Sequence, residues 1–360
     1  MNGFDKSIKS KIINVRSHIL LHNKDYSPIL DLKNLLKEIE SEPEIIAASP
    51  ISSNELMIQR HEVVETTICK GIELERYRMI AEILRNPYIG YPSQEDLDKN
   101  GIIIGLEMAY QLGATVGDFI QVSSPIGKRP TPMGLLPRLK KLKVVGIFSS
   151  DLPDYDRTLS FVSLETADFF KVEKGVDQIE IKTVNPQKAS KIAKDLSKKL
   201  SNNLIIEDWS QLESNLFSSI KLEKMVMFII LAFMIVITSF NVVGSFSRLV
   251  VEKKADLGLL KVFGFENSSI KKIFILAGLI ISFLGVIIGL IISFVFLQLQ
   301  LKYNLIEIPI PGFPMKYLPV EIRWFEFVFV PIATMITVYL ATLYPVQKSI
   351  QISPIEIIRD

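Results

Sequence analysis

Three stretches of the sequence decide the fold: 225–247 (MVMFIILAFMIVITSFNVVGSFS), 273–301 (IFILAGLIISFLGVIIGLIISFVFLQLQL) and 327–347 (FVFVPIATMITVYLATLYPVQ). They are about 23, 29 and 21 residues long, and none contains Asp, Glu, Lys, Arg or His. A helix needs about 20 apolar residues to cross the hydrocarbon core of a bilayer, where its backbone groups must bond to one another. Buried core helices of a soluble protein are the alternative, but these runs would then present almost nothing polar to water. We therefore predict three membrane-spanning helices.

Outward from these runs, the charges are distributed unevenly. The 360 residues carry 41 Lys and Arg against 39 Asp and Glu, a net charge of +2. Up to Lys224 there are about 30 basic and 31 acidic residues, and after it about 11 and 8. The first part therefore has the mixed surface charge of a soluble domain, and the balance excludes the clustered basic excess of a nucleic-acid-binding protein.

The loops between the runs predict the orientation, because basic residues collect on the cytoplasmic side. The loop after the first run carries six basic residues and the loop after the second run carries three. The first loop and the C-terminal tail are therefore expected in the cytoplasm, and residues 1–224 on the opposite side. Residues 1–24 contain no apolar core of signal-peptide length, so we expect that Met1 is an internal methionine and that a fourth transmembrane helix precedes it.

The N-terminal part has the pattern of an α+β domain. Apolar residues recur at helical spacing in 29–39 and 187–200. Ile102–Ile104, 119–122 and 142–148 have the apolar, β-branched or alternating character of strands. A turn is expected between Gly113 and Gly117.

A proline-rich segment, 125–138 (PIGKRPTPMGLLPR), lies between two of these strands. Because proline has no backbone N–H, the segment is not expected to pair as a central strand, and it is too long for a tight turn. We interpret it as a loop. Two readings stay open: a stiff projection that binds a partner through apolar side chains, or an ordinary long loop folded onto its own domain.

Motifs for chemistry are absent from the sequence. It contains no G-x-x-x-x-G-K-[ST], G-x-S-x-G, H-E-x-x-H or C-x-x-C pattern. The single cysteine, Cys69, permits no intramolecular disulfide. We therefore expect no catalytic residue, no metal site and no cofactor, and a non-catalytic membrane subunit. The runs also lack the charged residues that proton or ion pathways need at mid-depth.

The loop after the first run, 252–265 (EKKADLGLLKVFGF), is charged at its start and apolar at its end. Leu257, Leu260 and Phe263 share roughly one helical face, and Gly264 suits the left-handed residue that ends a helix. Such a helix can dock into a groove of a partner or lie on the membrane surface, and both readings stay open. In the second run, Gly278, Gly285 and Gly289 are candidates for close helix packing.

The segment 252–294 resembles the shared core of the FtsX-like/MacB-like permeases, and 344–356 is similar to their closing motif. The opening MNGF, GLEMAYQLGATVGDFIQV (105–122), TPMGLLPRLKKLKVVGIF (131–148) and Tyr155–Asp156 resemble the lipoprotein-releasing permeases of the LolC/LolE type. The resemblance covers essentially the whole chain. It implies a periplasmic α+β domain with a MacB-like core at 1–224, including a hook loop at 125–138. It also implies a permease domain at 225–360, an all-α bundle with three visible spans.

The resemblance also implies roles for individual residues. In 252–265, the coupling segment would touch a separate ATPase subunit through Glu252, Asp256, Leu257, Leu260, Lys261, Phe263 and Gly264. The hook would engage a periplasmic lipoprotein chaperone through Thr131, Pro132, Met133, Gly134, Leu136, Pro137 and Arg138.

The function implied is that of a permease subunit of an ABC transporter in the bacterial inner membrane, which extracts lipoproteins and passes them to the chaperone. Its expected partners are an ATP-binding subunit, a second permease subunit in a homo- or heterodimer, the chaperone, lipoprotein substrates and membrane lipid, with no nucleic acid. Three alternatives stay open: a MacB-like exporter of small molecules or peptides, an FtsX-like regulator of cell-wall hydrolases, and a membrane-anchored structural protein.

Overall fold

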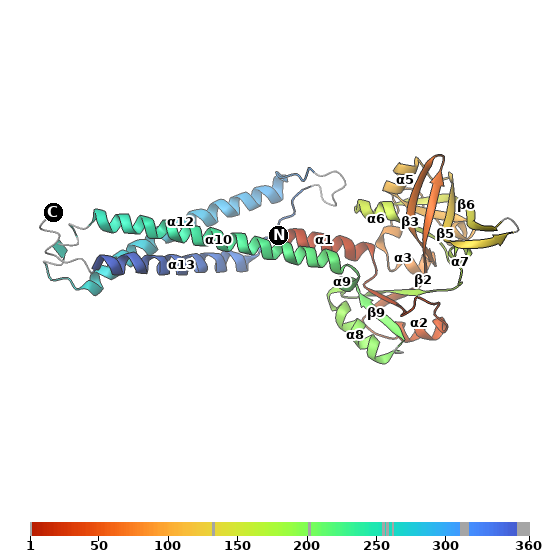
Figure 1. Ribbon diagram of the computed structural model, residues 1–360, viewed down its shortest axis with the longest axis horizontal. Coiled ribbons are helices and arrows are strands. Elements are labelled where there is room, and N and C mark those ends of the chain that lie inside the picture. Colours follow the sequence, from red (N-terminus) through yellow and green to blue (C-terminus); the bar gives the residue numbers. More distant parts are fainter. Residues whose placement is uncertain are drawn as a thin grey trace. The chain divides into compact units, whose positions relative to one another are not determined.

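A computed structural model describes residues 2–131, 134–200, 203–253, 256, 259–260, 263–309 and 317–350. The chain divides into two compact units. One contains Phe4–Phe217 and the other is built mainly from Ser218–Glu307 and Tyr317–Asp360. The expected fold class is confirmed, because an α+β domain is followed by long apolar helices (Figure 1).

The α+β unit contains nine strands among its described residues, which are β1 (Ile19–Asn23), β2 (Ile45–Arg60), β3 (Val63–Ile72), β4 (Gly101–Gly105), β5 (Phe119–Thr131), β6 (Gly134–Phe148), β7 (Leu159–Ser163), β8 (Gln178–Thr183) and β9 (Leu204–Asp208). They follow the order β3-β7-β4-β6-β5-β2-β8-β1-β9, and β3 also pairs with β2. The strand β2 therefore joins two regions: its first half pairs with β8, and its second half pairs with β3 and β5.

The helices that precede, connect and follow these strands are α1 (Asn2–Val15), α2 (Leu32–Glu40), α3 (Leu74–Arg78), α4 (Gln94–Asp98), α5 (Leu106–Leu112), α6 (Pro153–Thr158), α7 (Leu164–Phe170), α8 (Ala189–Lys199), α9 (Trp209–Leu212) and the 3₁₀ turns η1 (Glu82–Leu84) and η2 (Pro186–Lys188). Two apolar cores result. One lies among β2–β7 with α5 and α7, and the other packs α2 and α8 on β1 and β8.

Most of the local predictions for this unit are confirmed. The helix expected at 29–39 begins later, at Leu32, and buries Leu36 and Ile39. The strand expected at Ile102–Ile104 is β4, which is buried throughout between β6 and β7. The expected turn is present, since Gly113 and Gly117 both have positive φ angles of 57° and 100°.

The prediction of a loop at 125–138 is wrong. β5 continues to Thr131 and β6 begins at Gly134, and the two pair antiparallel after an irregularity between Ser124 and Lys128. The prolines are tolerated because β5 pairs with β2 only at Gln121–Ser123. Beyond this point the two strands form a ribbon whose outer edges pair with no other strand among the described residues. Figure 1 shows this ribbon extending from the sheet.

The membrane unit consists of α10 (Ser214–Glu252), α12 (Asn267–Tyr303) and α13 (Trp324–Ile350). All three are long and apolar enough to cross a membrane, and each contains one of the uncharged runs. Near the start of α12, Val250 of α10 packs with Ile270 and Phe274 of α12. The chain is thus a membrane protein with three described spans.

Candidate functional site

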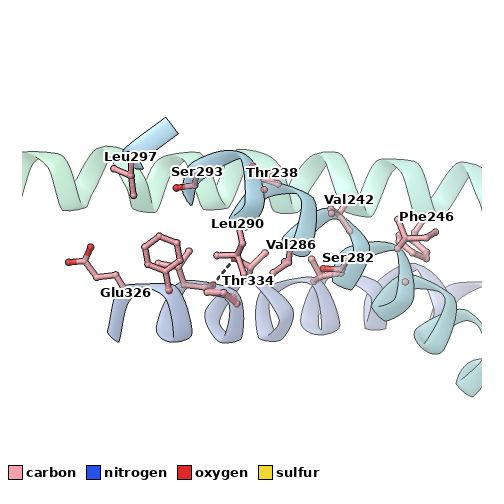
Figure 2. A pocket seen from close by; sticks show the side chains of 18 residues that line it. Thr238, Val242, Phe246, Ser282, Val286, Leu290, Ser293, Leu297, Glu326 and Thr334 are labelled. Carbon is pink, nitrogen blue, oxygen red and sulfur yellow. Dashed lines mark hydrogen bonds between the residues drawn. The ribbon is translucent and has the colours of Figure 1, made fainter. Parts of the chain in front are cut away.

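A groove between the three apolar helices of the membrane unit has a volume of about 610 Å³. Its walls come from α10, α12 and α13 (Figure 2). The residues that line it are Thr238, Val242, Phe246, Gly278, Ile281, Ser282, Gly285, Val286, Gly289, Leu290, Ser293, Leu297, Glu326, Phe327, Val330, Pro331, Thr334 and Val338. Its volume falls in the range of about 300–1,000 Å³ that is usual for small-molecule sites.

The three glycines proposed for helix packing have different surroundings. A Cβ atom at Gly278 would lie 2.8 Å from Cζ of Phe246 and 3.0 Å from Cγ2 of Thr342, so the three helices meet closely there. A Cβ atom at Gly285 or Gly289 would meet nothing within 4 Å among the described residues, and both glycines face the groove. Helix packing at these two positions stays a prediction.

The hydroxyl groups in the groove wall do not make it polar. Thr238 donates to the carbonyl oxygen of Met234 at 2.8 Å, and Thr334 donates to that of Val330 at 2.9 Å. Both of these hydroxyls bond within their own helices, and most of the residues that line the groove are apolar. Glu326 is the one charged residue among those that line it, and Figure 2 shows it at the end near Leu297, away from Phe246.

Neither the groove nor Glu326 was predicted from the sequence, because the predictions considered only charged residues inside the three runs. The signal in the sequence was the position of Glu326, immediately before the third run and two residues after Trp324.

The β5–β6 ribbon contains the residues proposed as a hook. The base of this ribbon is fixed to α7. Arg138 donates from Nη1 to the carbonyl oxygens of Phe169 and Lys171. The Lys140 ammonium lies 5.3 Å from the centre of the Phe169 ring, and burial lowers the pKa of Lys140 against an opposing effect of Glu165. The backbones of Thr131, Gly134 and Leu136 are in the ribbon, and Pro137 is exposed. Pro132 and Met133 lie outside the described residues.

The coupling segment begins where α10 ends, at Glu252. Asp256 forms an exposed ion pair with Lys253 at 3.0 Å. The expected helix end at Gly264 is confirmed, because its φ is 86° and the N–H of Phe265 bonds to the carbonyl oxygen of Leu260 at 3.1 Å. Leu257 and Lys261 lie outside the described residues.

Leu260 and Phe263, which were expected to share one face, differ in their surroundings. Leu260 packs against Val250, Ile270 and Phe274 and so belongs to the helix bundle. Phe263 is 77% exposed. Of this pair, Phe263 is the apolar side chain that a partner could contact.

Ionisable groups in the α+β domain are engaged in structural contacts. No group of three or more metal-ligating side chains occurs in the part of the chain that the structure describes. His18 is buried with its Nδ1 2.9 Å from Oγ1 of Thr183, and burial, together with Lys182, lowers its pKa to about 4. Cys69 is also buried, and this burial raises its pKa to about 12.

These features define the class of protein. It is a membrane protein in which an α+β domain is joined to a bundle of apolar helices with an apolar groove, and the described residues contain no cluster of metal ligands. Residues 228–354 match the family model described as FtsX-like permease C-terminal. This part of the chain is therefore similar to the C-terminal part of FtsX-like permeases.

The whole chain is similar to proteins named "Lipoprotein-releasing system transmembrane protein LolC". It is 26% identical to that of Xylella fastidiosa and 28% identical to that of Neisseria meningitidis, in alignments that cover 100% of this chain and 88% of each relative. A LolE of Haemophilus influenzae is 23% identical over 99% of this chain and 88% of its own length. The resemblance to the LolC/LolE type is confirmed.

Among solved structures, the periplasmic region of MacB from Actinobacillus actinomycetemcomitans aligns with a TM-score of 0.38 and 12% identity, over 57% of this chain and 94% of that one. The extracellular domain of a transporter named YknZ aligns with a TM-score of 0.36 and 10% identity, over 53% of this chain and 99% of that one. Similarity at this level supports no inference about function.

Proposed function

We propose that this chain is a permease subunit of an ABC transporter that extracts lipoproteins from the inner membrane and passes them to a periplasmic chaperone, while a separate subunit hydrolyses ATP. The observation that carries the proposal is the similarity to LolC proteins over 100% of this chain and 88% of those relatives. This similarity covers both the α+β domain and the apolar helices, so the proposal concerns the whole chain.

The energetics of the task explain why such a protein would need an apolar groove. A lipoprotein with two or three acyl chains buries roughly 40 methylenes, and at about 0.8 kcal/mol each their transfer to water would cost on the order of 30 kcal/mol. The chains must therefore move from the bilayer to another apolar surface. The groove between α10, α12 and α13 provides such a surface within the membrane.

The placement of the parts follows from the basic residues in the loops. The loop between the first and second uncharged runs, residues 248–272, carries six basic residues against three in the next loop, and we place it in the cytoplasm, where the coupling segment would meet the ATPase subunit. The α+β domain would then lie in the periplasm, where the tip of the β5–β6 ribbon would contact the chaperone. A second permease subunit would complete the transporter.

A release assay tests the proposal. Vesicles that contain the full chain, the ATPase subunit with which it co-purifies and a labelled lipoprotein should transfer the label to soluble chaperone when ATP is added. A photo-reactive residue at Met133 should crosslink to the chaperone. ATP hydrolysis without transfer, or crosslinks confined to the chain's own α+β domain, would contradict the assignment.

A further inference from the structure

The pairing of the β5–β6 ribbon is weakest at its base. Ser124 of β5 pairs with Arg138 of β6, and the next pair is Lys128 with Pro137, so residues 125–127 have no partner in this register. Extra residues of this kind bend a strand and interrupt its hydrogen bonds, and Pro137 has no N–H to donate. Because a two-stranded ribbon is only marginally stable by itself, its direction must be set by contacts at the base.

Arg138 makes such contacts, and it does so next to the irregularity. Its Nη1 donates to the carbonyl oxygen of Phe169 at 2.8 Å and also to that of Lys171. Both oxygens lie at the C-terminal end of α7, where carbonyl groups lack partners within the helix and a positive charge is favoured. Hydrogen bonds from a guanidinium are stronger than those between neutral groups. Arg138 thus ties β6 to α7 on the base side of the irregularity.

The end of α7 is a fixed support for this contact. Phe170, the last residue of the helix, is 1% exposed and belongs to the apolar core among β2–β7. The next residue, Lys171, forms a largely buried ion pair with Asp177 at 2.9 Å. Asp177 in turn accepts a hydrogen bond from the backbone N–H of Ser53 in β2 at 3.1 Å. Arg138 is therefore bound to a segment that is held both in the core and on β2.

We propose that Arg138 is a positioning residue, which holds the ribbon in one direction and so presents its tip to the chaperone without contacting the chaperone itself. The inference rests on the proposed function and changes the role that the resemblance implied for Arg138. To bind a partner, the guanidinium would have to leave two carbonyl oxygens, and this would release the ribbon at the same time. A binding segment that is fixed in advance binds more tightly, because it loses less freedom in the complex.

Distances between two spin labels test the fixed direction without the chaperone. One label is attached at Leu135→Cys in the ribbon and the other at Tyr110→Cys in α5, since Tyr110 is 80% exposed and the buried Cys69 takes up little label. In the full chain in nanodiscs, the distance distribution from double electron–electron resonance should be about twice as broad with Arg138→Met as with the native arginine. Equally narrow distributions would refute the inference.

Chaperone binding measures the consequence of releasing the ribbon. The full chain in nanodiscs is titrated with the purified chaperone of the same organism. If the released ribbon points in the binding direction in about a tenth of the molecules, Arg138→Met should bind about 10-fold more weakly, because the apparent Kd rises as the competent fraction falls.

Arg60→Met is the matched control for this loss. Arg60 also donates to two carbonyl oxygens at the end of a helix, those of Leu112 and Gly113 after α5. It lies beside Asp118, at the end of β5 that is opposite to the ribbon, so Arg60→Met should bind the chaperone as the wild type does. An equal loss of binding in both variants would mean that a general disturbance of the domain is responsible, and would refute the positioning role.

A crosslink separates positioning from direct contact. Val172 follows Lys171 and is 68% exposed. Arg138→Cys/Val172→Cys lacks the guanidinium and should bind about 10-fold more weakly, and joining its two thiols with a short bifunctional maleimide should restore the wild-type affinity to within about 2-fold. If the crosslinked protein binds no better than the uncrosslinked one, Arg138 contacts the chaperone and the proposal is wrong.

The outcomes separate this inference from the proposed function. Wild-type affinity in Arg138→Met would refute only the positioning role. If the wild-type chain does not bind the chaperone, the handover in the proposed function is refuted, whatever the spin labels show.

Discussion

Phe263→Asp is expected to lower the amount of ATPase subunit that co-purifies with this chain by at least about 30-fold. Phe263 is 77% exposed at the end of the coupling segment. An aromatic side chain that forms the centre of an interface contributes about 2 kcal/mol or more, and a carboxylate there would add a desolvation cost. Quantitative mass spectrometry of the detergent-solubilised complex measures the loss.

The control for this substitution is Tyr110→Asp. Tyr110 is 80% exposed and lies in the α+β domain, so its replacement should leave the recovery of the ATPase subunit unchanged. Leu260 is unsuitable for the test because it packs in the helix bundle, and a charge there would disturb folding. Normal recovery with Phe263→Asp would show that the coupling segment does not contact the ATPase through this residue.

Lys70→Met is expected to reduce the free energy of unfolding of the α+β domain by about 3–5 kcal/mol at pH 7. Lys70 Nζ lies 2.6 Å from Oε1 of Glu180, and both side chains are largely buried. Tyr77 donates its hydroxyl to Oε2 of the same carboxylate at 2.9 Å. The pair joins β3 to β8. Removing the ammonium group would leave the buried negative charge of Glu180 without its partner.

The pH dependence gives the sign of this effect. Burial alone would raise the pKa of Glu180, but Lys70 and the hydrogen bonds from Lys70 and Tyr77 outweigh it and hold this pKa below its ordinary value. The pair therefore contributes stability above the ordinary pKa of about 4.5, and this stability is lost as pH falls through the lower pKa of the folded state. In Lys70→Met, protonation of Glu180 removes the buried charge. Because burial raises the pKa of Glu180 once Lys70 is removed, the difference between the variant and the wild type should begin to shrink as the pH falls toward 4.5. It should shrink further as the pH falls through the lower pKa of Glu180 in the folded wild type.

The buried Cys69 provides a readout confined to this domain. Its reactivity with a thiol reagent in increasing urea, measured on the full chain, reports opening of the α+β domain. Lys70→Met/Glu180→Gln should recover most of the loss. Lys99→Met, which removes the exposed Lys99–Glu95 pair, should leave the midpoint unchanged. An equal shift of the urea midpoint for Lys70→Met and Lys99→Met would mean that the buried pair stabilises the domain no more than the exposed pair does.

The main architecture could be predicted from the sequence because its signals are local and strong. The three uncharged runs are long enough to require helices in lipid, and Ile102–Ile104 could only form a buried strand. The joining role of β2 could not be predicted, since pairing with β3, β5 and β8 is a long-range property that no local pattern encodes.

The candidate sites were predictable only in part, for the same reason. The prolines of 125–138 suggested a loop because the absence of a second strand partner beyond Ser123 was not visible in the sequence. The different roles of Leu260 and Phe263 depend on where α10 and α12 meet. The groove and the position of Glu326 at its end depend on the packing of three helices that are far apart in the chain.

The central claim is that the α+β domain and the coupling segment lie on opposite sides of the membrane. Labelling of single cysteines in spheroplasts with a membrane-impermeant maleimide tests it most directly, because buried Cys69 gives little background. The account predicts rapid labelling of Tyr110→Cys, and labelling of Asp256→Cys only after the membrane is lysed. Labelling of Asp256→Cys in intact spheroplasts, or protection of Tyr110→Cys until lysis, would contradict it.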